Sequence, residues 1–561
     1  MNAQFSFLGY VLLQSIVISV VVLVLYDIVK RVFSLDPFLT YCATIILLGL
    51  LGYVTFWIAY INYTAFGFLK ITALSTFVIW ALFLAYRSQI GAYLHYLAEP
   101  LLYTFLFFLV IITLGFSNGR LDNPLNTARN RFSHTLPIDN AIPEIVAGAL
   151  GIGHIASPLF TDWLSSDRPP LQTGLYLLLT LRKGLLEYQT VASWLQATFL
   201  LGVWSLLESA GLSASARRLS MLACCLLPTA IINTFYVWPK MLATGYLMLV
   251  FALLFCFRPS GRFDRTFAGI LVGAAAALAI LSHGTSFFAL IGFGTVLLIA
   301  RPWPLWGPAL YGLATLAAIY APWTVYLNVL DPPGNRLLKW HLAGVAQVDA
   351  RDFVTALRDS YAALSWHDYL QGRLENVRAL IGPWSQHLRD ILALVVESDR
   401  AVAAKVRASD FFNFVPSLHL FAIASLCAVL LLPFMPDEEK RQRNIALALL
   451  AATLVTFAVW AVLMFIPGST VNHHGTYAVQ VSAAVFAFMV MSLRAPALAI
   501  AFIAMQTITV ATLYVFTLPH DASLWPLQVV CVAAATGLFG YTFHPTFARS
   551  TRQSLGGRSG L

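Results

Sequence analysis

Two carboxylates in the polar segment 118–189 have the spacing for acid–base chemistry. Pro137 and Pro143 bracket Asp139, and Glu144 falls in the first turn of a helix that Pro143 can start. The positive end of that helix dipole stabilises a carboxylate placed just before it. An ionised carboxylate at this position suits a general base or a metal ligand. The alternative is that Asp139 only caps the helix, and residue type and spacing alone favour the cap.

A second signal is the run Asp167-Arg168-Pro169-Pro170. The two prolines stiffen the chain just before 175–188, an apolar stretch interrupted by charges that we expect to lie at the membrane interface. Arg168 would then be held at the depth of the lipid phosphates, with Asp167 beside it as a third candidate carboxylate. Equally weighted alternatives are a lipid-headgroup anchor and an Asp167–Arg168 surface pair.

Further polar residues gather at the ends of predicted spans. Each alone has an ordinary explanation, because interfacial lysines are common and a lone histidine usually satisfies a local hydrogen bond. Together they place cations and imidazoles on the same side as Asp139, as an anionic, phosphate-bearing lipid would require. They are Lys240, His283, Arg336, Lys339, His341, His473, His474 and Tyr477.

The composition requires a membrane around these residues. Of 561 residues, 59% are hydrophobic and 11% charged, with a mean hydropathy of +0.77. A soluble domain is about 45–50% apolar and about 25% charged. A soluble enzyme, a nucleic-acid binder and a disordered protein are therefore excluded. No Walker, GxGxxG or HExxH motif is present, and the six cysteines lie in apolar runs without metal spacing.

Hydropathy predicts an all-α polytopic membrane protein with about 13–15 transmembrane helices, since a bilayer core needs about 20 apolar residues per span. We expect amphipathic helices in two long outer loops, for example over 353–364 and 377–395. The apolar runs are 8–27, 38–60, 71–86, 98–116, 190–212, 219–235, 240–257, 266–282, 285–300, 307–325, 412–434, 444–466, 475–493, 496–517 and 524–542.

Lysine and arginine in the short loops predict the orientation. With an external N-terminus, one side receives most of the basic residues, including Lys30, Arg217, Arg262, Lys440 and the tail arginines, whereas the other short loops hold little besides Lys70 and Lys240. The first side is therefore expected to be cytoplasmic. The predicted parts are N-terminal helices 1–116, a first outer loop 117–189, central helices 190–327, a second outer loop 328–411, C-terminal helices 412–545 and a cytoplasmic tail 546–561.

At these residues the sequence resembles integral-membrane glycosyltransferases of the GT-C fold. The likeness is to the branch with protein O-mannosyltransferases, the lipid A aminoarabinose transferase and rhizobial lipopolysaccharide galacturonosyltransferases. Members have a first outer loop with a catalytic acidic residue, closed by a His/Arg-Pro-Pro-Leu element. Asp139 with Glu144 stands at the acidic position, and Arg168 to Leu171 at the closing element. Lys240 after Trp-Pro, and the run from His473 to Tyr477, resemble the donor-phosphate side.

The resemblance implies sugar transfer at the periplasmic face of the cytoplasmic membrane, in cell-envelope synthesis. A polyprenyl-phosphate sugar would present its phosphate to the cations named above. Asp139 would activate the hydroxyl of a lipid, glycan or protein acceptor, with inversion at the anomeric carbon. No nucleic acid is implied as a partner. The metal requirement stays open: if Mg²⁺ or Mn²⁺ is used, Asp139 and Glu144 are its candidate ligands.

The sequence departs from the family in three ways. About four spans precede the catalytic loop instead of one, the usual Asp-Glu pair is Asp139-Asn140, and a late Arg/His-Tyr-x-x-Pro element lacks its proline. Two other functions compete with the glycosyltransferase. A surface-polysaccharide polymerase or ligase would share an outer site and a lipid-linked donor. A flippase or transporter would place charges near the midplane, whereas Glu208 lies near the cytoplasmic end of its predicted span.

Overall fold

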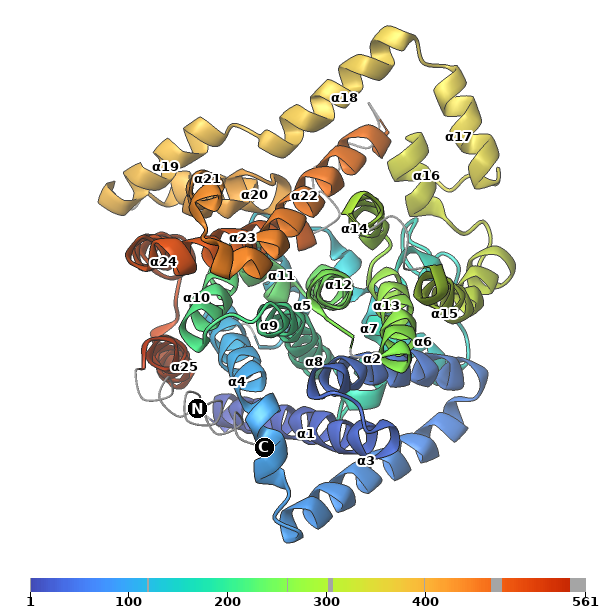
Figure 1. Cartoon of the computed structure of the whole chain (residues 1–561). Coiled ribbons are helices and arrows are strands. Elements are labelled where there is room, and N and C mark those ends of the chain that lie inside the picture. Colours follow the sequence, from blue (N-terminus) through green and yellow to red (C-terminus); the bar gives the residue numbers. More distant parts are fainter. Residues whose placement is uncertain are drawn as a thin grey trace.

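The computed structural model describes residues 2–118, 121–259, 261–300, 306–397, 399–465 and 477–544. Within these ranges the chain is helical throughout and forms no strand beyond one isolated bridge between Phe160 and Trp163. Figure 1 shows the bundle, with helices from all parts of the chain packed around its centre. The predicted all-α polytopic class is confirmed.

The described residues include ten helices that are long and apolar enough to cross a membrane. A bent pair, α10 (Ala214–Cys225) and α11 (Pro228–Tyr236), turns by 59° and would make an eleventh. The ten are α1 (Asn2–Phe33), α2 (Pro37–Ile61), α3 (Tyr63–Tyr86), α4 (Ile90–Gly115), α8 (Leu185–Ala197) with α9 (Phe199–Ser209), α13 (Arg262–Ser282), α15 (Trp306–Val325) with η4 (Tyr326–Leu330), α22 (Lys440–Leu463), α24 (Pro496–Ala511) with η8 (Thr512–Phe516), and α25 (Trp525–Phe543).

Each apolar run of the sequence forms a helix, but the described residues contain ten or eleven full-length spans, below the expected thirteen to fifteen. Four of the runs form apolar helices of 10–17 residues, which fall short of the roughly 20 residues that a span needs. They are α12 (Lys240–Phe251) with η3 (Ala252–Cys256), α14 (Ser286–Ala300), α21 (Leu420–Leu431) with η6 (Leu432–Phe434), and α23 (Ala478–Arg494). Four spans precede the first loop, as predicted.

The first outer loop is built into the bundle. It forms α5 (Pro124–Arg131), η1 (Ile138–Ala141), α6 (Ile142–Ile152), η2 (Ser165–Asp167) and α7 (Leu171–Leu179). Every residue of α7 is buried, and it crosses α2 so closely that a Cβ on Gly174 would lie 2.0 Å from the carbonyl oxygen of Gly52. The expectation of one interfacial segment over 175–188 is therefore wrong. The chain leaves the helix at Thr180 and starts α8 at Leu185, so the charges at 182 and 183 lie in the break.

The second loop forms a row of short helices: α16 (Arg336–Ala343), α17 (Phe353–Ala362), α18 (Trp366–Ile381), α19 (Trp384–Glu397) and α20 (Arg400–Phe412). In Figure 1 the yellow helices α17 to α19 run along the edge of the bundle. The expected amphipathic helix over 353–364 is α17. The single helix expected over 377–395 is interrupted, because Gly382 has a φ of +60° and Pro383 follows it.

Candidate functional site

A cavity of about 340 Å³ lies between the first loop, the start of the second loop and the ends of α13, α15 and α22. Aromatic, aliphatic and proline side chains form most of its wall. The charged and imidazole side chains on the wall are Asp139, Asp167, Arg168, His283, Arg336 and His341. The structure thus brings together six of the residues that the sequence singled out.

The cavity lies at one face of the predicted membrane. His283 follows the last residue of α13, a helix of 21 residues that starts at Arg262, so about 30 Å separates the two. Trp460 and Met464, at the end of α22, also line the cavity, while Lys440 starts that helix. In both helices the basic residues stand at the end remote from the cavity.

Asp139 is the buried carboxylate of this site, 2% exposed. One oxygen accepts an ion-paired hydrogen bond from Nη2 of Arg168, which is equally buried. The other oxygen accepts a hydrogen bond of 2.9 Å from the hydroxyl of Tyr236. Tyr236 ends the bent pair α10–α11, and its single O–H is shared between Asp139 and the carbonyl oxygen of Pro137, 2.7 Å away. A cation and a phenol therefore fix both oxygens of Asp139 at the cavity wall.

Asp139 does not cap the following helix. It lies inside η1, the residue before α6 is Ala141, and no side chain caps that helix. Pro143 does lie in the first turn and Glu144 follows it, as expected. The sequence favoured Asp139 as the cap of this helix. That interpretation is wrong, because the additional short turn η1 separates Asp139 from the start of α6 and places it beside Arg168.

Arg168 lies over two indole rings. Its guanidinium carbon is 5.3 Å from the ring centre of Trp163 and 5.2 Å from that of Trp238. Arg336 lies 5.2 Å from the ring centre of Trp163, and Nζ of Lys240 lies 3.6 Å from that of Trp238. Cations and indoles therefore alternate along the site, in an arrangement that stabilises positive charge in a dry environment. We call these five residues the cation–indole row.

The three cations of the row differ in how many of their N–H groups have a hydrogen-bond partner. Arg336 donates to Asp167 at 2.9 Å and to Asp162, so its charge is already compensated. Arg168 bonds Asp139 through Nη2 and a backbone carbonyl through Nη1, but its buried Nε–H has no hydrogen-bond partner among the described residues. Within the same ranges, Nζ of buried Lys240 donates no hydrogen bond. Unpaired buried donors of this kind are costly unless a ligand satisfies them.

The electrostatic environment shifts several pKa values in the cavity. Burial raises the pKa of Asp167 to about 6, against the opposing effect of Arg336. Burial lowers the pKa of Arg168 to about 10. Burial, together with the charges of Lys240 and Arg168, lowers the pKa of His341 to about 3 and moves that of His283 in the same direction. Burial, and to a lesser degree the charge of Arg168, also lowers the pKa of Lys240 well below its usual value. Both imidazoles are neutral at pH 7, so the positive charge of the site without a bound anion comes from Arg168 and Arg336.

Other predicted site residues lie away from the cavity wall. Nζ of Lys339 donates to the carbonyl oxygens of Asp349 and Arg351 and ties the second loop together. Glu144 is half-buried, and burial raises its pKa, but it does not line the cavity. Tyr477 is buried behind the row, its ring centre 4.9 Å from Nζ of Lys240. His473 and His474 fall outside the residues that the structure describes.

A divalent metal at Asp139 does not fit the surroundings of this carboxylate. Its two oxygens face a guanidinium and a phenol, whereas Mg²⁺ and Mn²⁺ need several oxygen ligands free of competing cations. Glu144 does not complete a metal-binding group with it: the group of three ligating side chains found in the described part of the chain is His387, Asp410 and His419.

The sequence did not indicate Tyr236 or Trp163 as parts of the site. Both stand beside residues that it did indicate, Tyr236 four positions before Lys240 and Trp163 four before Asp167. Since aromatic residues are frequent at membrane interfaces, only the three-dimensional arrangement distinguishes these two from the rest.

Comparisons with known proteins give a remote structural likeness. No protein-family model and no curated protein matches the sequence. Among solved structures, ArnT from Cupriavidus metallidurans bound to undecaprenyl phosphate aligns with a TM-score of 0.32 at 14% identity, over 66% of this chain and 77% of that one. Its apo structure aligns with a TM-score of 0.29 at 14% identity, over 66% and 76%. Scores of this size assign neither a family nor an activity to this chain.

Proposed function

We propose that this protein is a membrane glycosyltransferase of the GT-C kind, which moves a sugar from a polyprenyl-phosphate donor to a lipid, glycan or protein acceptor. One observation supports it above all: a buried carboxylate, Asp139, shares a cavity wall with an arginine that has a free N–H and adjoins an unpaired lysine. A phosphate-bearing donor satisfies both cations, and the carboxylate beside them serves the acceptor.

The donor phosphate occupies the gap between Arg168 and Lys240. The guanidinium of Arg168, on the cavity wall, and Nζ of Lys240, which is not part of that wall, both lie against the indole of Trp238. Nε of Arg168 and Nζ of Lys240 have no hydrogen-bond partner among the described residues, so a phosphate that reaches both receives charge-assisted hydrogen bonds where little water competes. The indoles of Trp163 and Trp238 give the sugar and the first lipid units an apolar wall.

Asp139 acts as the base. An oxygen of its carboxylate accepts the proton of the acceptor hydroxyl, and the hydroxyl oxygen attacks the anomeric carbon from the face opposite the phosphate. The bond between that carbon and the phosphate oxygen breaks with its electron pair, and the polyprenyl phosphate leaves with inversion of the sugar. Arg168 and Lys240 stabilise the negative charge that grows on the departing phosphate.

The reaction takes place at the periplasmic face of the cytoplasmic membrane. The cavity stands at the ends of α13 and α22 remote from their basic residues, and basic helix ends favour the cytoplasm. The transporter alternative finds some support in the bent pair α10–α11, since broken helices are common in transporters. The break itself, however, consists of the apolar Leu226 and Leu227, and its second half delivers Tyr236 to Asp139.

The test is sugar transfer from a polyprenyl-phosphate-linked sugar in proteoliposomes. Asp139→Asn should lower the rate by about 10²–10⁴-fold, the usual contribution of a general base. Asp122→Asn, the same chemical change at an exposed position of the first loop, should retain the wild-type rate. Equal activity of both variants at equal folded fraction would refute the assignment of Asp139. Transport of intact donor without transfer would instead favour the flippase.

A further inference from the structure

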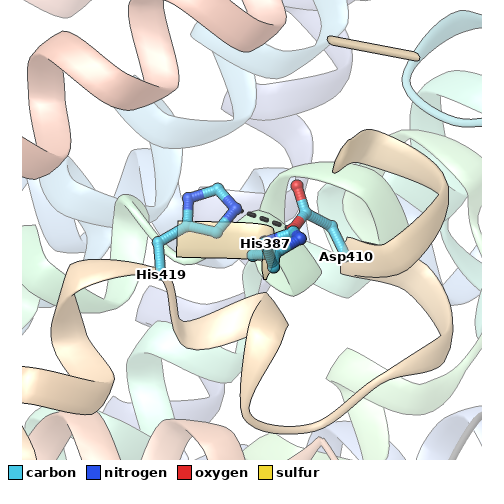
Figure 2. A group of neighbouring side chains, drawn as sticks. All are labelled: His387, Asp410 and His419. Carbon is cyan, nitrogen blue, oxygen red and sulfur yellow. Dashed lines mark hydrogen bonds and ion pairs between the residues drawn. The ribbon is translucent and has the colours of Figure 1, made fainter. Parts of the chain in front are cut away.

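A second cluster of polar side chains lies where the second loop meets the bundle. His387 of α19, Asp410 of α20 and His419, which precedes α21, are all fully buried. One nitrogen of each histidine and one carboxylate oxygen of Asp410 lie within 4.8 Å of one another. Figure 2 shows both imidazoles directed at the same carboxylate. The proposed glycosyltransferase mechanism uses none of these residues.

The separations are close to those of metal ligands. Nε2 of His387 lies 3.3 Å from Oδ1 of Asp410, and Nε2 of His419 forms a hydrogen bond of 2.6 Å with the same oxygen. Tetrahedral Zn²⁺ with bonds of about 2.0–2.1 Å holds neighbouring ligand atoms about 3.3 Å apart. The pair with His387 already has this spacing, whereas Nε2 of His419 has to move about 0.7 Å further from the carboxylate oxygen to reach it.

The hydrogen bonds around the cluster orient its side chains and leave one imidazole nitrogen unpaired. Nε2 of His387 has no hydrogen bond to any other described residue. The second carboxylate oxygen of Asp410 accepts a hydrogen bond of 2.6 Å from Tyr514, which orients the first oxygen toward the histidines. Gln506 lies 3.5 Å from Nδ1 of His419. Such outer contacts orient metal ligands in known sites.

The backbone also directs His419 into the cluster. Its φ is +49°, in a region that side-chain-bearing residues rarely adopt, and strain of this kind collects at functional sites. The nearby cation Arg407 donates through Nη1 to the carbonyl oxygen of Leu513 and to Thr517, 2.9 Å each. It therefore leaves the first oxygen of Asp410 to the two imidazoles.

We propose that His387, Asp410 and His419 bind one divalent transition-metal ion, with Zn²⁺ as the ion that best fits two imidazoles and a carboxylate. The ion fastens α19 and α20 to the start of α21. Its effect reaches the cavity through the residue after Asp410, because Phe411 stacks on Trp238 of the cation–indole row with ring centres 5.8 Å apart. The inference does not depend on the proposed function.

The experiment measures metal in the full-length protein, purified in detergent without a polyhistidine tag and without chelator. Elemental analysis should find about one zinc per chain, as one set of three protein ligands and a water can hold. His387→Asn, Asp410→Asn and His419→Asn should each lose it. His367→Asn, at an exposed histidine of α18 in the same loop, should keep it. Cobalt added to metal-stripped wild type should give the visible absorption of a tetrahedral site.

Wild-type protein that carries no zinc and takes up no cobalt would overturn the proposal, as would variants that keep a full equivalent of metal. If the cluster variants fail to fold, hydrogen exchange of the wild type decides. Chelation should speed amide exchange in α19 and α20 and leave α13 unchanged. Unchanged exchange in α19 and α20 after complete removal of the metal would contradict the proposed role.

Discussion

The ion pair between Asp139 and Arg168 predicts that the two residues are coupled in stability. The partners are 2% and 4% exposed, so neither charge is solvated when the other is removed. In Asp139→Asn the hydrogen bond from Tyr236 survives, while the guanidinium of Arg168 loses its counter-charge and meets an amide in its place.

The expected loss follows from the burial of the pair. Breaking a buried ion pair by neutralising one partner costs about 3–5 kcal/mol, most of it the penalty of an uncompensated charge. Arg168→Gln strands the carboxylate in the same way and should cost a similar amount. The double variant leaves two neutral amides, so its loss should fall short of the sum of the single losses by about 1–3 kcal/mol.

The assay is the reversible unfolding of each purified variant in mixed micelles as the fraction of denaturing detergent rises, with helix content as the signal. The control is Asp122→Asn together with Arg168→Gln, a pair without contact that should add within about 0.5 kcal/mol. Additive losses for Asp139 and Arg168 would refute the buried pair, and a loss below about 0.5 kcal/mol in Asp139→Asn would show that the charge of Arg168 is compensated elsewhere.

Three further results are expected. Burial raises the pKa of Asp167 to about 6, so the protonated form is favoured in the folded protein and its contribution to stability is lost as the pH rises through about 6. Asp167→Asn should remove that part of the stability–pH profile, and an unchanged profile would contradict the raised pKa. Lys240→Met should weaken binding of a polyprenyl phosphate in calorimetry by about tenfold or more, whereas Lys339→Met, whose Nζ is bound to backbone carbonyls of its own loop, should not. Gly273→Ala, whose Cβ would lie 2.0 Å from the carbonyl oxygen of Gly312, should cost about 1–3 kcal/mol in detergent unfolding, while Gly67→Ala, with no atom within 4 Å, should be neutral or slightly stabilising.

Hydropathy predicted the helices well because a membrane span has to form all of its backbone hydrogen bonds within itself and be apolar along its length. It failed on α7, whose nine residues are buried against α2. Burial inside a bundle and exposure to lipid favour the same apolar side chains, so composition does not separate them. The bent pair α10–α11 is a similar case, since Pro228 only marks where the helix restarts, and its 59° turn depends on packing.

The membrane itself made part of the site predictable. Helix ends that share a face of the bilayer are confined to a thin layer, so polar residues at those ends meet more often than residues of a soluble chain would. Asp139, Arg168, Arg336 and His341 were placed together on this ground, and all four line one cavity. The contacts of Lys339 were not predictable. It lies three residues after Arg336 on α16, but its buried Nζ donates to the carbonyl oxygens of Asp349 and Arg351 and does not line the cavity.

The metal cluster shows the limit of such reasoning. His387, Asp410 and His419 come from three separate helices or helix ends and have no recognisable ligand spacing in the sequence. A motif search detects ligands that share one element, as two histidines on one helix do. Ligands from three elements become visible only when the packing of those elements is known.

The structure also changes how the chemistry of Asp139 has to be tested. Were it a cap, replacement by asparagine would remove a charge and leave the fold intact, because asparagine caps a helix about as well. In the structure Asp139 is instead ion-paired with Arg168, the residue that is proposed to hold the donor phosphate. A phosphate bound at the free Nε–H of Arg168 shares the positive charge of that guanidinium with Asp139, which is bound through Nη2. The ion pair is thereby weakened, and an oxygen of Asp139 becomes available for the acceptor proton. Donor binding and base strength are therefore not independent, and a variant of either residue changes both.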